Sequence, residues 1–427
     1  MPFRFERITL ESWRQFHKID IEFHDKLTVI TGANGSGKSS LLGILTQHFG
    51  WQRIFLGTPL KRRFNGNPRF LTGLRQKRQA NVQEYPVGFI GYLPSAGAIL
   101  QTSAEALQYA ITIPSQKQVL GTYISSHRSL PYYQQIGSIQ IGAQSPDLAY
   151  GQYQSDSIQR SAGHYSGSSP VYRMKESLVS MATFGPKTEF SYGDSSALEI
   201  VHGFSEVLRK TMPPSLGFKN LSLRQTDVVL ETDSGNFLLD AASGGISAIV
   251  DITWQIYIYS LTSMVKASDG YVVVMDEPEN HLHPSMQREL LSNLIDAFPT
   301  AQFIVATHSP FMVSSVQDSS VYVLRYQEVS LDESEIEVDD GASPKRFVVS
   351  ERLDVVNRAG SAGDILRDVL GVPVTTPLWV ESELEDLVNE FRDLELNVGN
   401  LKELKSRMAS LGFGELYPQA IARLVQE

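Results

Sequence analysis

The chain has 427 residues, of which 42% are hydrophobic and 20% charged, so its composition is that of a globular protein and excludes wholesale disorder. Cysteine is absent, which excludes a disulfide scaffold, a thiol nucleophile and a cysteine-based zinc site. A net charge of −10, from 37 basic and 47 acidic side chains, argues against a surface that binds duplex DNA along its whole face. The charged first residues and the polar residues within the apolar stretch 252–265 predict neither a signal peptide nor a membrane span, so a cytoplasmic protein is expected.

The first fifty residues are typical of two strands, a buried strand, a glycine-rich turn and a helix. Strands are expected over 5–10, 19–23 and 27–31, and a helix over 39–49, where leucines recur at helical spacing. The turn before that helix fits the pattern G-x4-G-K-[ST], which predicts a phosphate-binding loop. Its backbone N–H groups can point at phosphate oxygens, its lysine can reach the β- and γ-phosphates, and its hydroxyl can bind Mg²⁺. The residues expected to bind nucleotide are Gly32, Asn34, Gly35, Ser36, Gly37, Lys38, Ser39 and Ser40, with Ser39 also holding the metal.

The segment 59–240 changes composition along its length. Residues 61–78 contain seven basic side chains and no acidic one. Residues 132–170 are rich in Gln, Ser, Gly and Tyr, which predicts a long, partly mobile loop. The other elements expected are strands over 87–93, 107–113 and 119–124, helices over 171–184 and 197–211, and a hairpin over 218–239 with its turn at 233–235.

After residue 240 the pattern alternates between helices and strands again. A turn of Ser243, Gly244 and Gly245 precedes a long apolar helix, and its backbone N–H groups predict a second anion-binding site. Because one subunit already surrounds the near side of the phosphates, we expect this turn to act on a nucleotide held by a second copy. The elements expected here are a helix over 245–266, a strand over 271–275, a helix over 284–298 and a strand over 302–306.

Two acids end the first of these strands, and a histidine follows the second. Acids at the carboxyl end of a buried parallel strand lie in the crevice where ligands bind in open α/β sheets. We expect Asp276 to hold Mg²⁺ and Glu277 to orient and deprotonate an attacking water. His308 is expected within reach of the γ-phosphate, whereas His281 and His283 lack the further ligands that a metal site would need.

These motifs resemble the ABC-type ATPases of the SMC and RecF kind, and among them the stand-alone AAA ATPase subunits of OLD-, Septu- and PARIS-type anti-phage defence modules. The matching segments are TGANGSGKSSLL, SGGISAIVD, VVVMDEPENHLHP and ATHSP, with the opening strand pair around Trp13. The resemblance implies an α/β fold, an ABC-type P-loop ATPase head. Such a head has a mixed sheet with flanking helices and an antiparallel β subdomain, here with an inserted region and a small helical C-terminal element. It also implies an ATP sandwich dimer, in which the catalytic residues Lys38, Glu277 and His308, with Ser39, Asp276 and Arg14, face Ser243, Gly244 and Gly245 of the neighbouring chain.

The resemblance also predicts a division of the chain. An N-terminal lobe is expected over 1–58, a β-rich and helical insertion over 59–240, a C-terminal lobe over 241–325, and an acidic loop with a helical docking region over 326–427. No heptad pattern predicts the long coiled coils of chromosome-organising relatives. Residues 376–386 resemble the start of a TOPRIM nuclease domain, but too little chain follows them to build it.

Three functions remain open at this point. The leading one is a slow ATPase, using ATP and Mg²⁺, which forms a homodimer or larger oligomer and gates a separate nuclease or toxin in anti-phage defence. The alternative is a RecF-like ATPase clamp that contacts DNA through the basic segment Lys61 to Arg78 during repair, where a solvated surface would account for the same charges. The third is a nucleotide-sensing scaffold with little turnover.

Overall fold

The computed structural model divides the chain into two compact units, Met1–Ile365 and Leu366–Glu427. The residues that it describes are 2–60, 69–72, 84–103, 106–128, 132–140, 142–164, 168–187, 193–266, 269–328, 346–354, 361–370, 377–392 and 397–425. Within these ranges, no helix combines the length and the apolar character needed to cross a bilayer.

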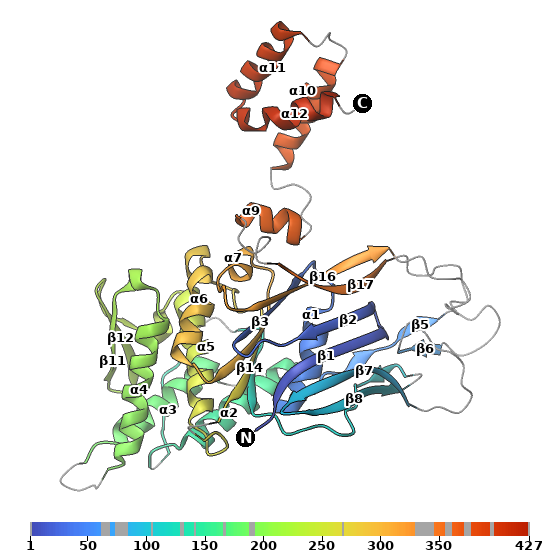
Figure 1. Ribbon diagram of the computed structural model, residues 1–427. Coiled ribbons are helices and arrows are strands. Elements are labelled where there is room, and N and C mark those ends of the chain that lie inside the picture. Colours follow the sequence, from blue (N-terminus) through green and yellow to red (C-terminus); the bar gives the residue numbers. More distant parts are fainter. Residues whose placement is uncertain are drawn as a thin grey trace. The chain divides into compact units, whose positions relative to one another are not determined.

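The first unit is built on a ten-stranded mixed sheet with the order β10-β14-β15-β3-β16-β17-β2-β1-β7-β8 (Figure 1). The five strands from β10 to β16 pair in parallel. Every residue of β3, β14 and β15 is buried, because helices and neighbouring segments cover both faces of a parallel sheet, and this explains why their sequences are mainly apolar. The strands of this half are β3 Leu27–Gly32, β10 Gly121–Ile124, β14 Tyr271–Asp276, β15 Ala301–Ala306 and β16 Ser320–Glu328.

The other half of the sheet consists mainly of antiparallel hairpins. In β1, Phe5, Ile8, Leu10 and Trp13 are fully buried while the intervening charged residues are exposed, as expected for a sheet with one covered face. The pairs β1–β2 and β7–β8 form an antiparallel β subdomain that shares a large hydrophobic core with the parallel strands. The strands are β1 Arg4–Trp13, β2 Phe16–Glu22, β7 Glu84–Leu93, β8 Ala96–Ser103 and β17 Arg346–Arg352, with the short pairs β4 Phe55–Leu56 and β9 Gln108–Tyr109, and β5 Thr58–Leu60 and β6 Arg69–Leu71.

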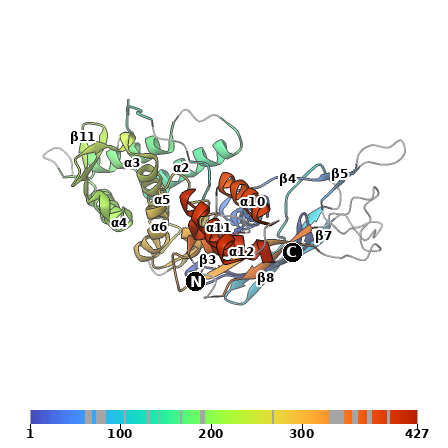
Figure 2. The same cartoon turned by 90° about the horizontal axis from the view of Figure 1, so that it is seen from above.

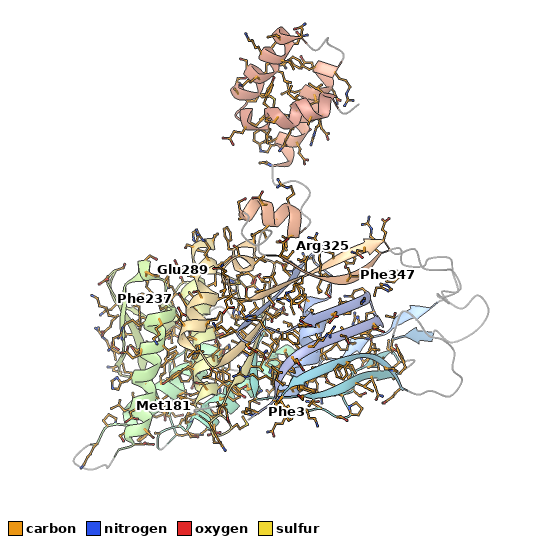
Figure 3. The ribbon with its side chains drawn as sticks, viewed as in Figure 1. Phe3, Met181, Phe237, Glu289, Arg325 and Phe347 are labelled. Atoms are coloured by element: carbon orange, nitrogen blue, oxygen red, sulfur yellow. The ribbon has the colours of Figure 1, made fainter. Side chains whose placement is uncertain are left out.

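Helices α3 to α6 and a small sheet lie together on one side of this unit, and the hairpins β1–β2 and β7–β8 lie on the other (Figures 1 and 2). Side chains fill the space between the large sheet and its helices (Figure 3). Almost all of α5 is buried, which explains why its sequence is mainly apolar on every side, with Asp251 among its few buried polar residues. The helices are α1 Lys38–Leu45, α2 Pro146–Ser161, α3 Pro170–Phe184, α4 Ser195–Thr211, α5 Gly244–Ser260, α6 Pro284–Ala297, α7 Pro310–Val313 and α9 Ala362–Asp364, and the small sheet is β11 Phe218–Arg224, β12 Asp227–Thr232 and β13 Phe237–Leu238.

The second unit has a hydrophobic core of its own. Helices α10 Leu378–Arg392, α11 Val398–Ser410 and α12 Tyr417–Val425 surround a cluster that includes Leu384, Leu404 and Met408. The small helical C-terminal element expected from the sequence is therefore confirmed, as are the α/β class, the mixed sheet with flanking helices and the antiparallel β subdomain. The remaining helical elements of the described ranges are four short 3₁₀ helices and one π-helix, η5: η1 Thr46–Phe49, η2 Pro214–Leu216, η3 Leu239–Ala241, η5 Ile365–Val369 and η6 Gly414–Leu416.

Three expectations for the insertion are wrong. The segment 132–170 contains helix α2, which buries Tyr150 and Tyr153, so it is not one long loop. The strand expected over 107–113 shrinks to Gln108–Tyr109. The main hairpin of the small sheet turns at Gln225, whose φ of 58° is left-handed, and the turn at 233–235 instead connects β12 to β13.

Two charged segments named in the sequence lie largely outside the described residues. Of the basic run 61–78, only 69–72 are described, and the acidic run that follows β16 falls in 329–345. The possible DNA contact through the basic run therefore stays a prediction.

Candidate active site

The phosphate loop, defined here as residues 32–38, joins β3 to α1, and residues of β16 and β2 pack closely against it. Gly32 has a φ of 143°, and a Cβ there would lie 2.5 Å from the carbonyl oxygen of Leu324 in β16. Gly37 has a φ of 99°, and a Cβ there would collide with the ring of Phe16 in β2. Both positions thus require glycine, for backbone conformation and for space.

The remaining residues of the loop differ in exposure. Asn34 and Gly35 are exposed, whereas Ser36 is fully buried and its Oγ has no hydrogen-bond partner within the described part of the chain. Ser39 and Ser40 lie half-buried in the first turn of α1, whose first N–H groups have no partner inside the helix. A glycine at the N-cap leaves this helix end open to an anion.

The turn of the β1–β2 hairpin lies against the phosphate loop. Gln15 donates from its side chain to the carbonyl oxygen of Gly35 over 3.3 Å. Its neighbour Arg14 has a left-handed φ of 52°, and its guanidinium stacks on the ring of Phe55 with the carbon 5.3 Å from the ring centroid. Arg14 is therefore adjacent in sequence to a residue that contacts the loop, while its own guanidinium stacks on the ring of Phe55.

Lys38 is the most buried cation of the site. Its ammonium group lies 2.7 Å from Nε2 of His308 and donates to the carbonyl oxygen of Gly32 over 3.1 Å. Burial lowers the pKa of Lys38 to about 8, although the acids that end β14 oppose the shift. The lysine thus folds back onto its own loop and onto the end of β15.

Asp276 ends β14 beside the first turn of α1. Burial raises its pKa, and a hydrogen bond with Ser39 opposes the increase. Its Oδ1 is buried with no hydrogen-bond partner among the residues described. A buried carboxylate oxygen without a partner, next to a hydroxyl and close to a phosphate loop, is the oxygen donor set that Mg²⁺ prefers. The residues present therefore fit a magnesium ion.

Glu277 follows in a strained conformation, with a φ of 47°. Its N–H donates to the carbonyl oxygen of Ala306 over 2.8 Å, and its own carbonyl oxygen accepts from Arg128 over 2.8 Å. Its carboxylate accepts from Asn280 over 3.2 Å and lies 3.7 Å from Nε2 of His308. The glutamate side chain is one-third exposed, so it faces the open side of the site.

His308 is held by a residue that the sequence analysis missed. Glu279 accepts from the backbone N–H of His308 over 2.8 Å and from the hydroxyl of Thr307 over 2.6 Å. Burial raises the pKa of Glu279 and lowers that of His308, whose pKa the Lys38 charge lowers further. A third acid close after the pair at the end of β14 was the available signal for Glu279.

The Ser243 turn, defined here as residues 243–245, begins helix α5, which precedes β14 and its acids in the chain. Ser243 is exposed and caps the helix by accepting from the N–H of Ile246 over 3.4 Å. Gly245 is buried, and a Cβ there would lie 3.1 Å from the carbonyl oxygen of His281. Gly244, the first residue of the helix, is half-buried, so the turn presents an exposed serine that caps the start of the helix.

A cluster of charged side chains stabilises the segment that immediately precedes this turn. Lys175 in α3 is fully buried, and its ammonium group lies 2.5 Å from Asp240 and 3.2 Å from Asp227. Asp240 belongs to the short turn η3, which leads directly into Ser243. Because a buried charge needs a partner, this cluster holds η3 against α3.

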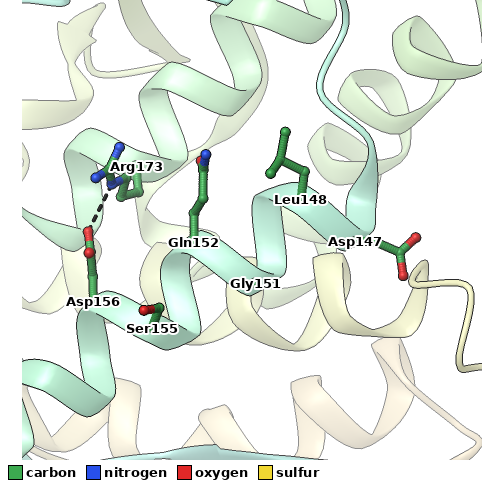
Figure 4. Close-up of a pocket in the computed structure, with 7 residues that line it drawn as sticks. All are labelled: Asp147, Leu148, Gly151, Gln152, Ser155, Asp156 and Arg173. Carbon is green, nitrogen blue, oxygen red and sulfur yellow. Dashed lines mark hydrogen bonds and ion pairs between the residues drawn. The ribbon is translucent and has the colours of Figure 1, made fainter.

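A pocket of about 390 Å³ lies along α2 and α3, and its lining includes none of the expected site residues (Figure 4). Its charges are already paired: Arg173 lies 2.8 Å from Asp156 and 2.9 Å from Glu176, and Asp147 accepts from Ser263 over 2.7 Å. This pocket therefore offers little to a charged ligand.

Two family models match the chain where the site residues lie. Residues 7–83 match a family described as "AAA domain", and residues 242–314 match "AAA domain, putative AbiEii toxin, Type IV TA system". The first range contains the phosphate loop, and the second contains the Ser243 turn and the residues from Asp276 to His308. Both parts of the site therefore lie in segments that are similar to AAA domains.

Among curated proteins, the chain is similar to the Retron Ec83 probable ATPase of Escherichia coli, with 28% identity over 29% of this chain and 24% of that protein. It is also similar to the Septu protein PtuA of Bacillus thuringiensis, with 24% identity over 40% of this chain and 42% of that protein. The chain thus spans less than half the length of these relatives. The resemblance to AAA ATPases of the Septu kind, expected from the motifs, is confirmed.

Among solved structures, the SMC head domain from Thermotoga maritima matches with 12% identity and a TM-score of 0.42, covering 82% of this chain and 100% of that one.

Proposed function

We propose that this protein is a magnesium-dependent ATPase that works as a homodimer, with nucleotide bound between the phosphate loop of one copy and the Ser243 turn of the other. The observation that carries the proposal is the meeting of Lys38, His308 and Glu277 beside the Ser39–Asp276 pair. A cation, a hydroxyl–carboxylate pair that fits Mg²⁺ and a partly exposed carboxylate at one edge of a parallel sheet are the parts that phosphoryl transfer requires.

In this proposal each side chain has one task. The loop N–H groups and Lys38 bind the β- and γ-phosphates, and Ser39 and Asp276 would hold Mg²⁺, which neutralises phosphate charge. Glu277 accepts a proton from water while the water oxygen bonds to the γ-phosphorus and the bond to the β-phosphate oxygen breaks. His308 donates to a γ-phosphate oxygen. ADP and phosphate are released.

We include a second copy of the chain in the proposed site because of the Ser243 turn. Ser243 is exposed at the start of α5, and the phosphate loop already has its own cation and acids, so the turn is not needed to complete the site of its own chain. We infer that the turn completes the site of a neighbouring chain and that Arg14 and Ser40 lie at the edges of the nucleotide.

We further propose that dimerisation controls a separate effector, a nuclease or toxin, in anti-phage defence. The support is the similarity to a Septu protein and to a retron ATPase, which covers less than half of either relative. The second unit, with its own core and helices, is the part that we assign to effector docking.

The test combines turnover, nucleotide affinity and mass. Glu277→Gln should lower kcat on the order of 10²- to 10⁴-fold while nucleotide still binds, and it should accumulate an ATP-dependent dimer in light scattering. The exposed Glu289 on α6 (Figure 3) supplies the matched control, and Glu289→Gln should leave all three readouts unchanged. Unchanged turnover in Glu277→Gln, or a monomer at saturating ATP, would contradict the proposal.

A further inference from the structure

Arg128 holds the Glu277 backbone from the edge of the large sheet. It follows the edge strand β10, which pairs with β14, and its Nη2 donates to the carbonyl oxygen of Glu277 over 2.8 Å. A second link runs the other way, since Asn280 donates to the carbonyl oxygen of Ser126 over 3.2 Å. The same Asn280 amide group also contacts the Glu277 carboxylate. Residues 126–128 and 277–280 are thus connected at both the backbone and the side chain of Glu277.

The Arg128 guanidinium has N–H donors that make no hydrogen bond to the described residues. Its Nε and Nη1 are buried, and neither has a hydrogen-bond partner within the described ranges. Burial lowers the pKa of Arg128, and the acids Asp251, Glu279 and Glu277 oppose the shift. A guanidinium has five N–H donors, and leaving them idle in a buried place is unfavourable. The unused donors therefore point to a state of the protein in which they are bonded.

The first of the opposing acids lies on α5. Asp251 is buried, accepts a hydrogen bond from Tyr153 of α2, and accepts another from Gln255 over 3.1 Å. It lies seven residues along α5 from Gly244. At 1.5 Å per residue this is about 10 Å, or two turns of a single helix. Whatever moves the N-terminal end of α5 therefore moves Asp251 with it.

We propose that Arg128 is a positioning residue that transmits engagement of α5 to the Glu277 carboxylate. When the Ser243 turn engages the phosphates of a second copy, α5 brings Asp251 onto the free donors of Arg128, and Arg128 fixes the Glu277 peptide. Glu277 is sensitive to this contact because its backbone is left-handed, a conformation that surrounding groups must maintain. A misplacement of about 1 Å at a reacting group can cost 10²-fold in rate. The inference rests on the proposed ATPase function.

The test measures kcat, KM and the affinity for a non-hydrolysable ATP analogue in the full-length protein. Arg128→Gln should lower kcat about 10- to 100-fold and leave KM and analogue affinity within about threefold. Arg128→Lys should recover part of the loss, because it restores a donor. Arg173→Gln is the matched control, since Arg173 is a partly buried arginine with two acidic partners elsewhere, and its kcat should be unchanged.

A double-mutant cycle with Asp251→Asn completes the test. If Arg128 and Asp251 act as one link, the double variant should lose no more kcat than Arg128→Gln alone. Additive losses, an unchanged kcat in Arg128→Gln, or parallel losses of kcat and analogue affinity would overturn the inference. Should Arg128→Gln fail to fold, Arg128→Lys and Asp251→Asn carry the same comparison. Absence of turnover in the unmodified protein would instead overturn the proposed function.

Discussion

The two glycine turns of this protein begin helices in the same way but differ in what surrounds them. The phosphate loop is enclosed by β16 and by the β1–β2 hairpin, and it has Lys38 as its own cation. The Ser243 turn begins with an exposed serine, and the ion pair of Lys175 with Asp240 stabilises the segment that precedes it. Helix ends attract anions in both cases, but only the first is equipped to hold one without help. The contrast supports the proposal that the second turn complements the phosphate loop of another copy.

The largest effect should come from the loop itself. Gly37→Ala places a Cβ against Phe16 in a backbone conformation that alanine rarely adopts, so the loop cannot keep its shape. We expect ATP affinity to fall more than 100-fold, measured by titration with a fluorescent ATP analogue. Exposed Gly151, in the interior of α2, is the control, and Gly151→Ala should bind normally. Normal binding in Gly37→Ala would show that the loop does not hold the phosphates.

A smaller and different effect is expected at the second turn. In Gly245→Ala the new Cβ lies 3.1 Å from the carbonyl oxygen of His281, so the helix end must shift by a few tenths of an ångström. We expect the ATP affinity of the monomer to stay within about threefold, while dimerisation of the Glu277→Gln background weakens about tenfold, as a loss of about 1.4 kcal/mol requires. Sedimentation at graded protein concentration measures this. Equal losses at both steps would remove the distinction between the two turns.

Mixing two inactive variants tests whether the turns act across the dimer. Neither Gly37→Ala nor Gly245→Asp should hydrolyse ATP alone. In a symmetric dimer, half of the randomly paired chains are mixed, and one of the two sites in each mixed dimer is intact, so turnover should recover to about a quarter of the unmodified level. The assay is phosphate release at equal total chain concentration. Mixtures as inactive as their components would place both turns on one chain's nucleotide.

The smallest effect concerns how α1 is anchored. His48, just after α1, contacts the carbonyl oxygen of Leu45 and the hydroxyl of Tyr92, each over 2.9 Å, and burial lowers its pKa to about 4. Since the unfolded chain takes up the proton near pH 6.5, the stabilising contribution is present above that pH and is lost as pH falls toward 4. We expect the free energy of unfolding to drop by about 2 kcal/mol over this window, after allowance for partial exposure.

Urea denaturation at several pH values measures the contribution. His48→Gln should flatten the dependence between pH 6.5 and 4, whereas the exposed His164→Gln should leave it intact. For Asp251 in α5 the pH dependence of stability has the opposite sign. Burial raises its pKa, so the folded protein binds this proton more tightly than the unfolded chain and gains stability as the pH falls. A His48→Gln curve parallel to that of the unmodified protein would refute the anchoring role.

Much of the site could be predicted because its residues follow strands directly. Asp276 ends β14, Glu277 follows it, and His308 comes two residues after β15; parallel strands bring their carboxyl ends to one edge. Arg128 could not be found in this way, because its contact with Glu277 joins segments 149 residues apart and depends on β10 pairing with β14. Pairing partners of an edge strand leave no mark in the local sequence.

The fold was predictable where apolar residues kept a clear period, and the errors have physical causes. Helix α2 was read as loop because its buried face consists of Tyr150, Tyr153 and Ala149 within a Gln- and Ser-rich sequence. Its start was nevertheless marked, since Ser145 accepts from the N–H of Leu148 and a proline follows it. The hairpin turn at Gln225 was missed because turn prediction favours glycine and asparagine there.

The cluster of Lys175, Asp227 and Asp240 has a consequence for how this protein can diverge. Losing the lysine alone would leave the buried carboxylate of Asp240 without its cation, and losing Asp240 alone would leave the fully buried lysine with only the partly exposed Asp227 as a carboxylate partner among the described residues. Such intermediates are unfit, so the three positions are expected to be inherited or replaced together. In related genomes, a change at one of them should therefore be accompanied by changes at the other two.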